Sequence, residues 1–140
     1  MKRFLIINGP NLNLLGHREP EYYGSVSFDE YLPHLRHAFP NVELDYYQSN
    51  HEGFLIDKLQ ESDGIYDGVV MNPGAYAHTS IALADCIRAM RIPVIEVHIS
   101  DISQREPYRK HSYTAEACVN CIVGQGLKGY DLGVRELLGI

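Results

Sequence analysis

The sequence has little of what marks a nucleic-acid binder or a membrane protein. Its 12 lysines and arginines are outnumbered by 18 acidic residues, and the formal net charge is -6. The arginines are scattered singly, so no basic face is available for a phosphate backbone. No apolar run approaches the roughly 20 residues that span a bilayer, and no charged leader with an apolar core precedes the first strand-like segment. We therefore expect a cytoplasmic protein that binds neither nucleic acid nor membranes.

Cysteine is also scarce. Cys86, Cys118 and Cys121 are an odd number, which suits a reducing compartment better than a disulfide framework. Cys118 and Cys121 have the C-x-x-C spacing, but their segment is apolar and strand-like, and strand positions three apart point to opposite faces. No second cysteine pair or His-x-x-x-His is present to complete a zinc site. We predict structural cysteines and no metal site.

The common cofactor and nucleophile motifs are missing. The chain contains no Gly-x-Gly-x-x-Gly, no phosphate-binding P-loop and no Gly-x-Ser-x-Gly. Lys2 precedes a strand, Lys58 lies in a polar part of a helix and Lys128 follows a glycine-rich stretch, so none resembles a buried lysine that forms a Schiff base. We therefore expect chemistry without a cofactor.

The composition and the pattern of apolar residues indicate one α/β domain, residues 1–140. With 45% hydrophobic residues, a chain of 140 residues can bury a core that is stable without disulfide bonds or bound metal. Short apolar, β-rich runs alternate with helical segments, a pattern typical of a parallel sheet. The expected strands are 4–7, 42–47, 68–71, 94–97 and 119–123, and the expected helices are 27–39, 51–62, 79–90 and 130–138. We predict a flavodoxin-like, doubly wound, five-stranded parallel sheet with helices on both faces. Ser27 and Glu30 form a capping box for the first helix, which Pro33 is expected to weaken or kink.

The segment from Asn8 to Gly24 follows the first strand. It contains more charged and aromatic side chains than a loop that only connects two elements. Long loops in compact domains are mostly functional or disordered, and its leucines and tyrosines argue against disorder. It contains Arg18 and Tyr23. A cation about 4 Å from a phenolate contributes on the order of 4 kcal/mol at an effective dielectric of about 20, enough to make the phenol a base. The alternative is a tyrosine that simply packs. We interpret the segment as a mobile lid that carries reactive groups.

The carboxyl ends of the other strands carry polar groups as well. Glu96, His98 and Ser100 share one face of a strand, so the carboxylate can orient the imidazole. Asn72 and His78 follow the third strand, together with the hydroxyls of Thr79 and Ser80. Because ligands of doubly wound sheets bind at the carboxyl ends of the strands, we expect one crevice there. The alternative for His98 is a buried histidine with a structural role.

Five segments resemble the type II 3-dehydroquinate dehydratases, or type II dehydroquinases, over almost the full length. The segments are Ile7-Asn-Gly-Pro-Asn-Leu-Asn-Leu-Leu-Gly16 with Arg18-Glu-Pro20 and Tyr23-Gly24, Ser49-Asn-His-Glu-Gly53, Asn72-Pro-Gly-Ala-Tyr76 with His78-Thr-Ser-Ile-Ala82, Ile95-Glu-Val-His98, and Arg109 with His111-Ser-Tyr113. The resemblance implies cofactor-free dehydration of 3-dehydroquinate to 3-dehydroshikimate through an enolate, a step of the shikimate pathway.

The resemblance also implies roles for individual residues. Tyr23 is the expected proton acceptor, Arg18 stabilises it and the transition state, and His98, held by Glu96, is the proton donor. Asn11 is expected to position a water on the enolate oxygen. The expected substrate-binding residues are Asn72, His78, Asp85, Ile99, Ser100 and Arg109, with Arg105 as a secondary candidate.

We expect Asp85 to lie on the same helix as His78, seven residues further on and roughly 10 Å away along the axis. The resemblance implies that it reaches a neighbouring subunit's site in a homo-oligomer, a dodecamer of four trimers. Asp101, Pro107-Tyr108 and Pro33 depart from the usual family pattern without touching a proposed catalytic group. The same reaction in catabolic quinate breakdown remains an alternative. A flavodoxin-like binding or signalling module is another, although Asn8, Asn72 and Gly124 stand where a phospho-acceptor receiver needs acids and a lysine.

Overall fold

The computed structural model describes residues 1–140 and contains one five-stranded sheet. The strands are β1 (Lys2–Asn8), β2 (Val42–Gln48), β3 (Gly68–Asn72), β4 (Val94–His98) and β5 (Asn120–Val123). They lie in the order β2-β1-β3-β4-β5, and every neighbouring pair is parallel. This is the flavodoxin-like strand order, so the predicted fold class is confirmed, with strand bounds within one or two residues of those expected.

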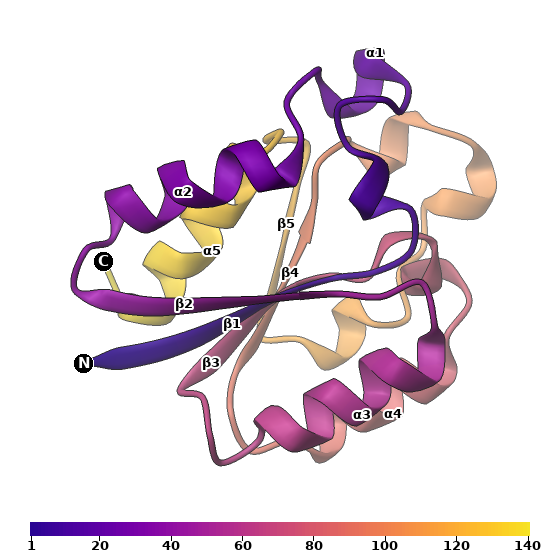
Figure 1. Ribbon diagram of the computed structural model, residues 1–140. Coiled ribbons are helices and arrows are strands. Elements are labelled where there is room, and N and C mark those ends of the chain that lie inside the picture. Colours follow the sequence, from indigo (N-terminus) through magenta and orange to yellow (C-terminus); the bar gives the residue numbers. More distant parts are fainter.

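Helices cover both faces of the sheet, because a parallel strand pair needs a crossover connection. The helices α2 (Phe28–Ala38) and α5 (Lys128–Leu138) pack on one face, and α3 (Glu52–Ser62) and α4 (Ile81–Ala89) pack on the other (Figure 1). Each face buries its own apolar cluster: Phe4, Ile6 and Val97 belong to the first, and Leu5 and Ile7 to the second. The alternation of side chains along a buried strand therefore supplies both cores.

Helix α2 begins and ends within one residue of the expected bounds, but Pro33 does not interrupt it. The Ser27 hydroxyl accepts a hydrogen bond from the Glu30 amide, and the Glu30 carboxylate accepts one from the Ser27 amide, which completes the capping box. The helix runs unbroken through Pro33 to Ala38. The exposed position of Pro33 and the burial of Leu32 and Leu35 on either side explain why packing holds the helix together.

The expectation that His78 and Asp85 share one helix is wrong. His78 ends a separate 3-10 helix, Gly74–His78, and Asp85 lies on α4. Ser80 separates the two because its side chain caps α4 by accepting a hydrogen bond from the Leu83 amide. The short helices Leu12–Leu14, α1 (Pro20–Tyr23), Ile102–Gln104 and Ala115–Ala117 were not predicted from the sequence, and a further short helix covers Pro107–Arg109.

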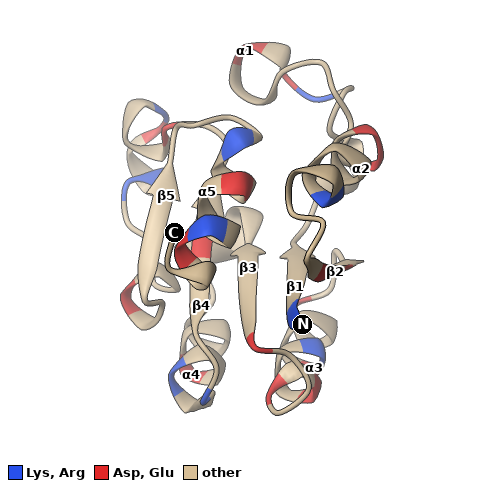
Figure 2. Cartoon of the chain, turned by 90° about the vertical axis from the view of Figure 1, so that its left-hand side faces the viewer, with Lys and Arg blue, Asp and Glu red and all other residues tan.

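The loops after β1 and β3 meet at the point where the winding of the sheet reverses. Gly9 is required there, because a Cβ on it would lie 2.4 Å from the Pro73 carbonyl oxygen. The Gly9 amide donates a hydrogen bond to the Asn72 carbonyl. Acidic and basic residues are interspersed over the helices and loops (Figure 2), and none of the helices has the length and apolar character to cross a bilayer.

Candidate active site

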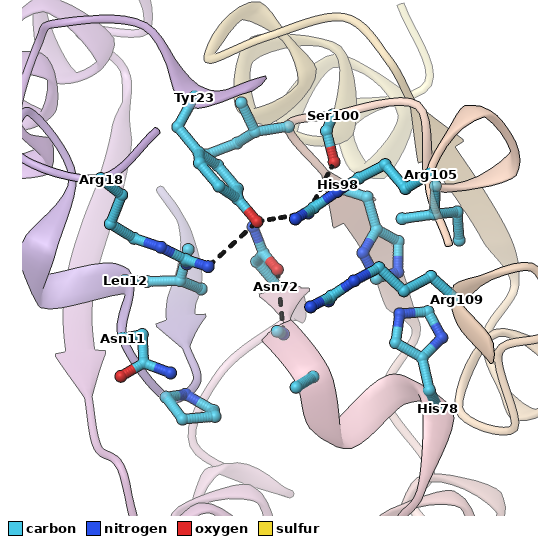
Figure 3. Close-up of a pocket in the computed structure, with 15 residues that line it drawn as sticks. Asn11, Leu12, Arg18, Tyr23, Asn72, His78, His98, Ser100, Arg105 and Arg109 are labelled. Atoms are coloured by element: carbon cyan, nitrogen blue, oxygen red, sulfur yellow. Dashed lines mark hydrogen bonds between the residues drawn. The ribbon is translucent and has the colours of Figure 1, made fainter. Parts of the chain in front are cut away.

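A pocket opens at the carboxyl ends of β1, β3 and β4, where the sequence predicted a crevice. It encloses about 500 Å³ of space that is continuous with solvent. The segment after β1 forms one wall and the segment after β4 the other (Figure 3). Its lining residues are Pro10, Asn11, Leu12, Arg18, Tyr23, Asn72, Gly74, Ala75, His78, His98, Ile99, Ser100, Ile102, Arg105 and Arg109.

Two guanidinium groups hold the hydroxyl of Tyr23 in this pocket. The tyrosine ends α1 and is buried. Arg18 donates a hydrogen bond of 3.0 Å to the phenol oxygen, and its guanidinium carbon lies 4.0 Å from the ring centroid. Arg105 donates a second bond to the same oxygen from the opposite wall (Figure 3). The predicted pair of Arg18 and Tyr23 is therefore in place, and the oxygen has a second cationic partner.

Arg105 was only a secondary candidate in the sequence. Its side chain is 4% exposed, with Glu19 at 3.8 Å and the ring of Tyr22 under its guanidinium at 4.2 Å. Burial lowers the pKa of Arg105, but the hydrogen bond and charge of Tyr23 more than offset this, so the net pKa is raised. The only signal in the sequence was its position five residues after Ser100. Its contact with Tyr23 spans 82 residues and depends on the fold of the lid segment.

His98 is backed by a buried carboxylate. Its Nε2 lies 2.7 Å from Oε2 of Glu96, and both residues are buried. The hydroxyls of Ser112 and Thr114 donate further hydrogen bonds to Glu96. Burial raises the pKa of Glu96, but the bond and charge of His98 and these hydroxyl bonds outweigh it, so the net pKa lies below 4.5. The pair expected from strand alternation is therefore formed, with two supporting hydroxyls that the sequence analysis missed.

No protein group bonds the other ring nitrogen of His98, Nδ1, and the residue lines the pocket. A ring that is anchored at Nε2 by a carboxylate presents its free nitrogen in a fixed direction. His98 and Tyr23 thus present an imidazole and a phenol, two groups that can exchange protons, on different walls of one pocket.

Asn72 is held by a buried network. Its Oδ1 accepts a hydrogen bond from the Gly74 amide, and its Nδ2 donates to the Tyr130 hydroxyl at 3.1 Å. Tyr130 in turn donates to Oδ1 of Asn8 at 2.7 Å and is fully buried. The sequence placed Tyr130 at the start of the last helix without a role. Its bonds to the ends of β1 and β3 fix the amide of Asn72 toward the pocket.

His78 and Arg109 lie on the side of the pocket opposite Arg18 (Figure 3). Nδ1 of His78 is 2.8 Å from the His111 carbonyl, which only accepts, so Nδ1 carries a hydrogen. Burial lowers the pKa of His78. Although the carbonyl bond raises it, the charges of His98 and Arg109 keep the net pKa below 6.5. A neutral His78 leaves Nε2 as an acceptor for a ligand hydroxyl. The guanidinium of Arg109 is held by Glu106 at 2.8 Å.

The remaining predicted residues divide into two groups. Asn11, Ile99 and Ser100 line the pocket, and Ser100 receives a bond of 3.4 Å from Arg105. Asp85 does not line it; the carboxylate is 71% exposed and lies 3.7 Å from Arg88. Thr79 is exposed, and the hydroxyl of Ser80 is used as a helix cap, so neither supplies a pocket group.

Comparison with known proteins gives consistent matches. The family model described as dehydroquinase class II matches residues 2–138. The chain is 50% identical over 137 residues to the 3-dehydroquinate dehydratase of Chlorobaculum tepidum, covering 96% of this chain and 93% of that protein. It is 48% identical over 140 residues to that of Clostridium botulinum, covering 99% and 95%. A solved type II dehydroquinase from Butyrivibrio crossotus has a TM-score of 0.95 and 45% identity, covering 98% of this chain and 97% of that one.

Proposed function

The chain belongs to the class II dehydroquinase family, and from this premise we propose that it is a hydro-lyase that removes water from 3-dehydroquinate to give 3-dehydroshikimate. The observation that carries the proposal is the pocket itself. It holds a phenol between two guanidinium groups and a histidine backed by a buried carboxylate. Elimination of water needs one group to accept a proton from carbon and another to protonate the departing oxygen.

The first step is proton removal by Tyr23. As a phenolate it takes the proton from C2 of the substrate, and the electron pair of the broken C–H bond forms an enolate with the neighbouring ketone. Each guanidinium about 4 Å away favours the anion by on the order of 4 kcal/mol at an effective dielectric of about 20. Arg18 and Arg105 together therefore provide the positive charge that stabilises the phenolate in the proposed step. Asn11 positions a water that donates a hydrogen bond to the enolate oxygen.

The second step is loss of the C1 hydroxyl. The enolate collapses, a C=C bond forms between C1 and C2, and the C1–O bond breaks. His98 gives its Nδ1 proton to the departing oxygen, so the leaving group is water. Glu96 stabilises the imidazolium before the transfer and holds the ring afterwards. The cycle closes when the proton on Tyr23 returns to solvent and His98 is protonated again.

The polar groups around this pair suit a polyhydroxylated carboxylate. We assign the substrate carboxylate to Asn72, Ser100 and the backbone amides of Ile99 and Ser100. The network through Tyr130 supports this assignment because it restrains the Asn72 amide. We assign the ring hydroxyls to Nε2 of His78 and the guanidinium of Arg109. These groups neutralise and orient the substrate without a metal or an organic cofactor.

Two further parts of the proposal rest on the family resemblance. The reaction is assigned to the shikimate pathway of aromatic amino acid biosynthesis, with catabolic quinate breakdown as the alternative. The chain is assigned to a homo-oligomer of trimers, a dodecamer in its full form, in which Asp85 serves a neighbouring subunit's pocket. The side chain of Asp85 is 71% exposed, so a neighbouring subunit can contact it.

A single assay tests the base assignment. Absorbance in the enone band of 3-dehydroshikimate is followed with the wild type, Tyr23→Phe and the control Tyr22→Phe, which removes the neighbouring, 38% exposed phenol. We expect steady product formation by the wild type and the control, and at least a roughly hundredfold lower kcat for Tyr23→Phe, the usual contribution of a general base. Equal rates for the two variants contradict the assignment. Borohydride added with substrate is expected to leave activity intact, because no imine forms.

A further inference from the structure

A third side chain with metal-binding chemistry, Cys121, stands beside Glu96 and His98. In the parallel pair of β4 and β5, Glu96 is opposite Cys121. The thiol sulfur lies 3.7 Å from Oε2 of Glu96, and Nε2 of His98 lies 2.7 Å from the same oxygen. One carboxylate oxygen, one imidazole nitrogen and one sulfur therefore all lie within 4.8 Å of one another.

This cluster combines residues from two strands, so no spacing within one segment of the sequence indicates it. The prediction of no metal site considered only ligand pairs within one segment, such as C-x-x-C and His-x-x-x-His. Cys118 and Cys121 were predicted to point to opposite faces of one strand. Cys118 lies before β5, which begins at Asn120, so strand alternation does not apply to this pair. Strand register, which pairs residues 25 positions apart, brings the third group into place.

We propose that Glu96, His98 and Cys121 form a binding site for a borderline-soft divalent cation of the zinc type, and that the bound cation inhibits the enzyme. Thiolate, imidazole and carboxylate are the three ligand types that zinc takes in proteins. In a tetrahedron built with zinc–ligand bonds of about 2.0–2.3 Å, ligand atoms are roughly 3.3–3.7 Å apart. The observed separations lie close enough to this range for side-chain rotations to close the site.

The surroundings fit a weakly held ion better than a structural one. Ser112 and Thr114 hydroxyls bond the Glu96 carboxylate and would orient it as a ligand. Three protein ligands leave a fourth position for water, an open arrangement that permits exchange. Glu96 and His98 have side chains only 1% and 5% exposed, whereas Cys121 is half-buried, so a cation reaches the cluster from the side of β5.

Inhibition follows from the chemistry of the imidazole, and this step rests on the proposed function. An imidazolium carries protons on both ring nitrogens. A cation bound at Nε2 excludes that form, and it also neutralises the carboxylate that stabilises the imidazolium. His98 then has no readily transferred proton for the departing hydroxyl. The substrate pocket on the other side of the ring stays open, so we expect kcat to fall more than KM changes.

The binding site is tested without reference to activity by adding cobalt(II) alone to protein freed of metal with a chelator. We expect a near-ultraviolet thiolate-to-cobalt charge-transfer band in the wild type. The band is expected to disappear in Cys121→Val, a substitution that suits a strand, and to persist in the control Cys118→Ala. If Cys121→Val folds poorly by circular dichroism, Cys121→Ala replaces it. No band in the wild type, or a band that survives loss of Cys121, overturns the proposal.

Zinc inhibition of the dehydratase assay tests the consequence. We expect the wild type and Cys118→Ala to lose activity as zinc is added and to recover it with EDTA. Cys121→Val is expected to keep the basal activity and to need at least about tenfold more zinc for the same loss. Equal sensitivity of the two variants overturns the proposal. A protein without any dehydratase activity would contradict the proposed function, while the cobalt spectra would still decide the metal site.

Discussion

Tyr23 is the residue on which the proposed chemistry depends, and its hydroxyl oxygen lies between two guanidinium groups. Arg18 and Arg105 donate to one oxygen from opposite walls of the pocket, although they lie 87 positions apart in the chain. Each cation also lies near an aromatic ring, Arg18 over Tyr23 and Arg105 over Tyr22, so the guanidinium planes are fixed by stacking as well as by hydrogen bonds. A base held in this way needs little rearrangement during the reaction.

Glu96 gives a prediction about stability and pH. Its net pKa in the folded protein lies below the ordinary value of 4.5, so the folded state favours the ionised form more than the unfolded state does. The resulting stabilisation is complete above pH 4.5 and disappears as the pH falls through the folded-state pKa. We expect Glu96→Gln to lower the free energy of unfolding near neutral pH, and the difference from the wild type to shrink under acid conditions.

Urea unfolding of the two proteins from about pH 7 to about pH 3.5 measures this difference. Glu61→Gln is the matched control, since the Glu61 carboxylate on α3 is 63% exposed and bonds only the surface Lys58, so the substitution removes the same charge away from the buried pair. A difference between wild type and Glu96→Gln that grows toward low pH would contradict the assigned direction of the pKa shift.

At the scale of elements, α2 stays helical because its packing against the sheet outweighs the unfavourable proline in its interior. The capping box at Ser27 and Glu30 fixes where the helix starts. Pro33 has no amide hydrogen for the Asp29 carbonyl, which in an exposed helix interior costs about 3 kcal/mol. Burial of Phe28, Leu32 and Leu35 against the sheet compensates for the missing bond. The helix is therefore continuous for tertiary reasons.

Replacing this proline is expected to stabilise the protein. Pro33→Ala restores the hydrogen bond to the Asp29 carbonyl, and greater freedom of the unfolded chain offsets about 0.4–1 kcal/mol of the gain. We expect a net increase of about 1–2 kcal/mol in the free energy of unfolding, measured by urea titration, with unchanged dehydratase activity. Pro40→Ala, just beyond the helix, is the control and should change stability less. A loss of stability in Pro33→Ala would show that the proline ring contributes contacts that alanine lacks.

At the scale of the whole molecule, one chain forms a nearly complete site. The loops after β1, β3 and β4 converge because their strands are adjacent and parallel (Figure 1). The same geometry leaves Asp85 out of the pocket, since α4 packs against one face of the sheet and displays this carboxylate to solvent beside the exposed Ile81. A role for Asp85 in the reaction therefore requires a second chain.

Mixed oligomers test the shared site. Tyr23→Phe and Asp85→Ala chains are refolded together in equal amounts, each being expected to be nearly inactive alone. A complete pocket arises where an Asp85→Ala chain, which keeps Tyr23, receives Asp85 from a Tyr23→Phe neighbour. In an equal mixture about half of the chains keep Tyr23 and about half of their neighbours supply Asp85, so we expect about one quarter of wild-type activity.

The control mixes Tyr23→Phe with His98→Gln. Both side chains belong to the same chain's pocket, so no complete site can form and activity should not recover. Light scattering on each sample establishes that oligomers are present. Recovery no greater than the sum of the two separate variants would show that Asp85 serves only its own chain or none.

The sequence by itself determined the fold class and most of the pocket. Apolar runs alternating with helical segments specify a parallel sheet, because each run must be buried on both faces. The order of the polar segments after the strands then places Tyr23, His98 and Asn72 at one edge. These inferences depend on periodicity and chain order, which are local properties of a sequence.

Only the tertiary structure decided which distant side chains meet. Arg105 reaches Tyr23 across 82 positions, Tyr130 restrains Asn72 across 58, and Cys121 comes to Glu96 through the register of β4 and β5. No periodicity encodes such pairings, because they depend on how loops close and on how one strand slides past another before hydrogen bonds fix it. The sequence therefore specifies the groups at the pocket, and packing specifies their partners.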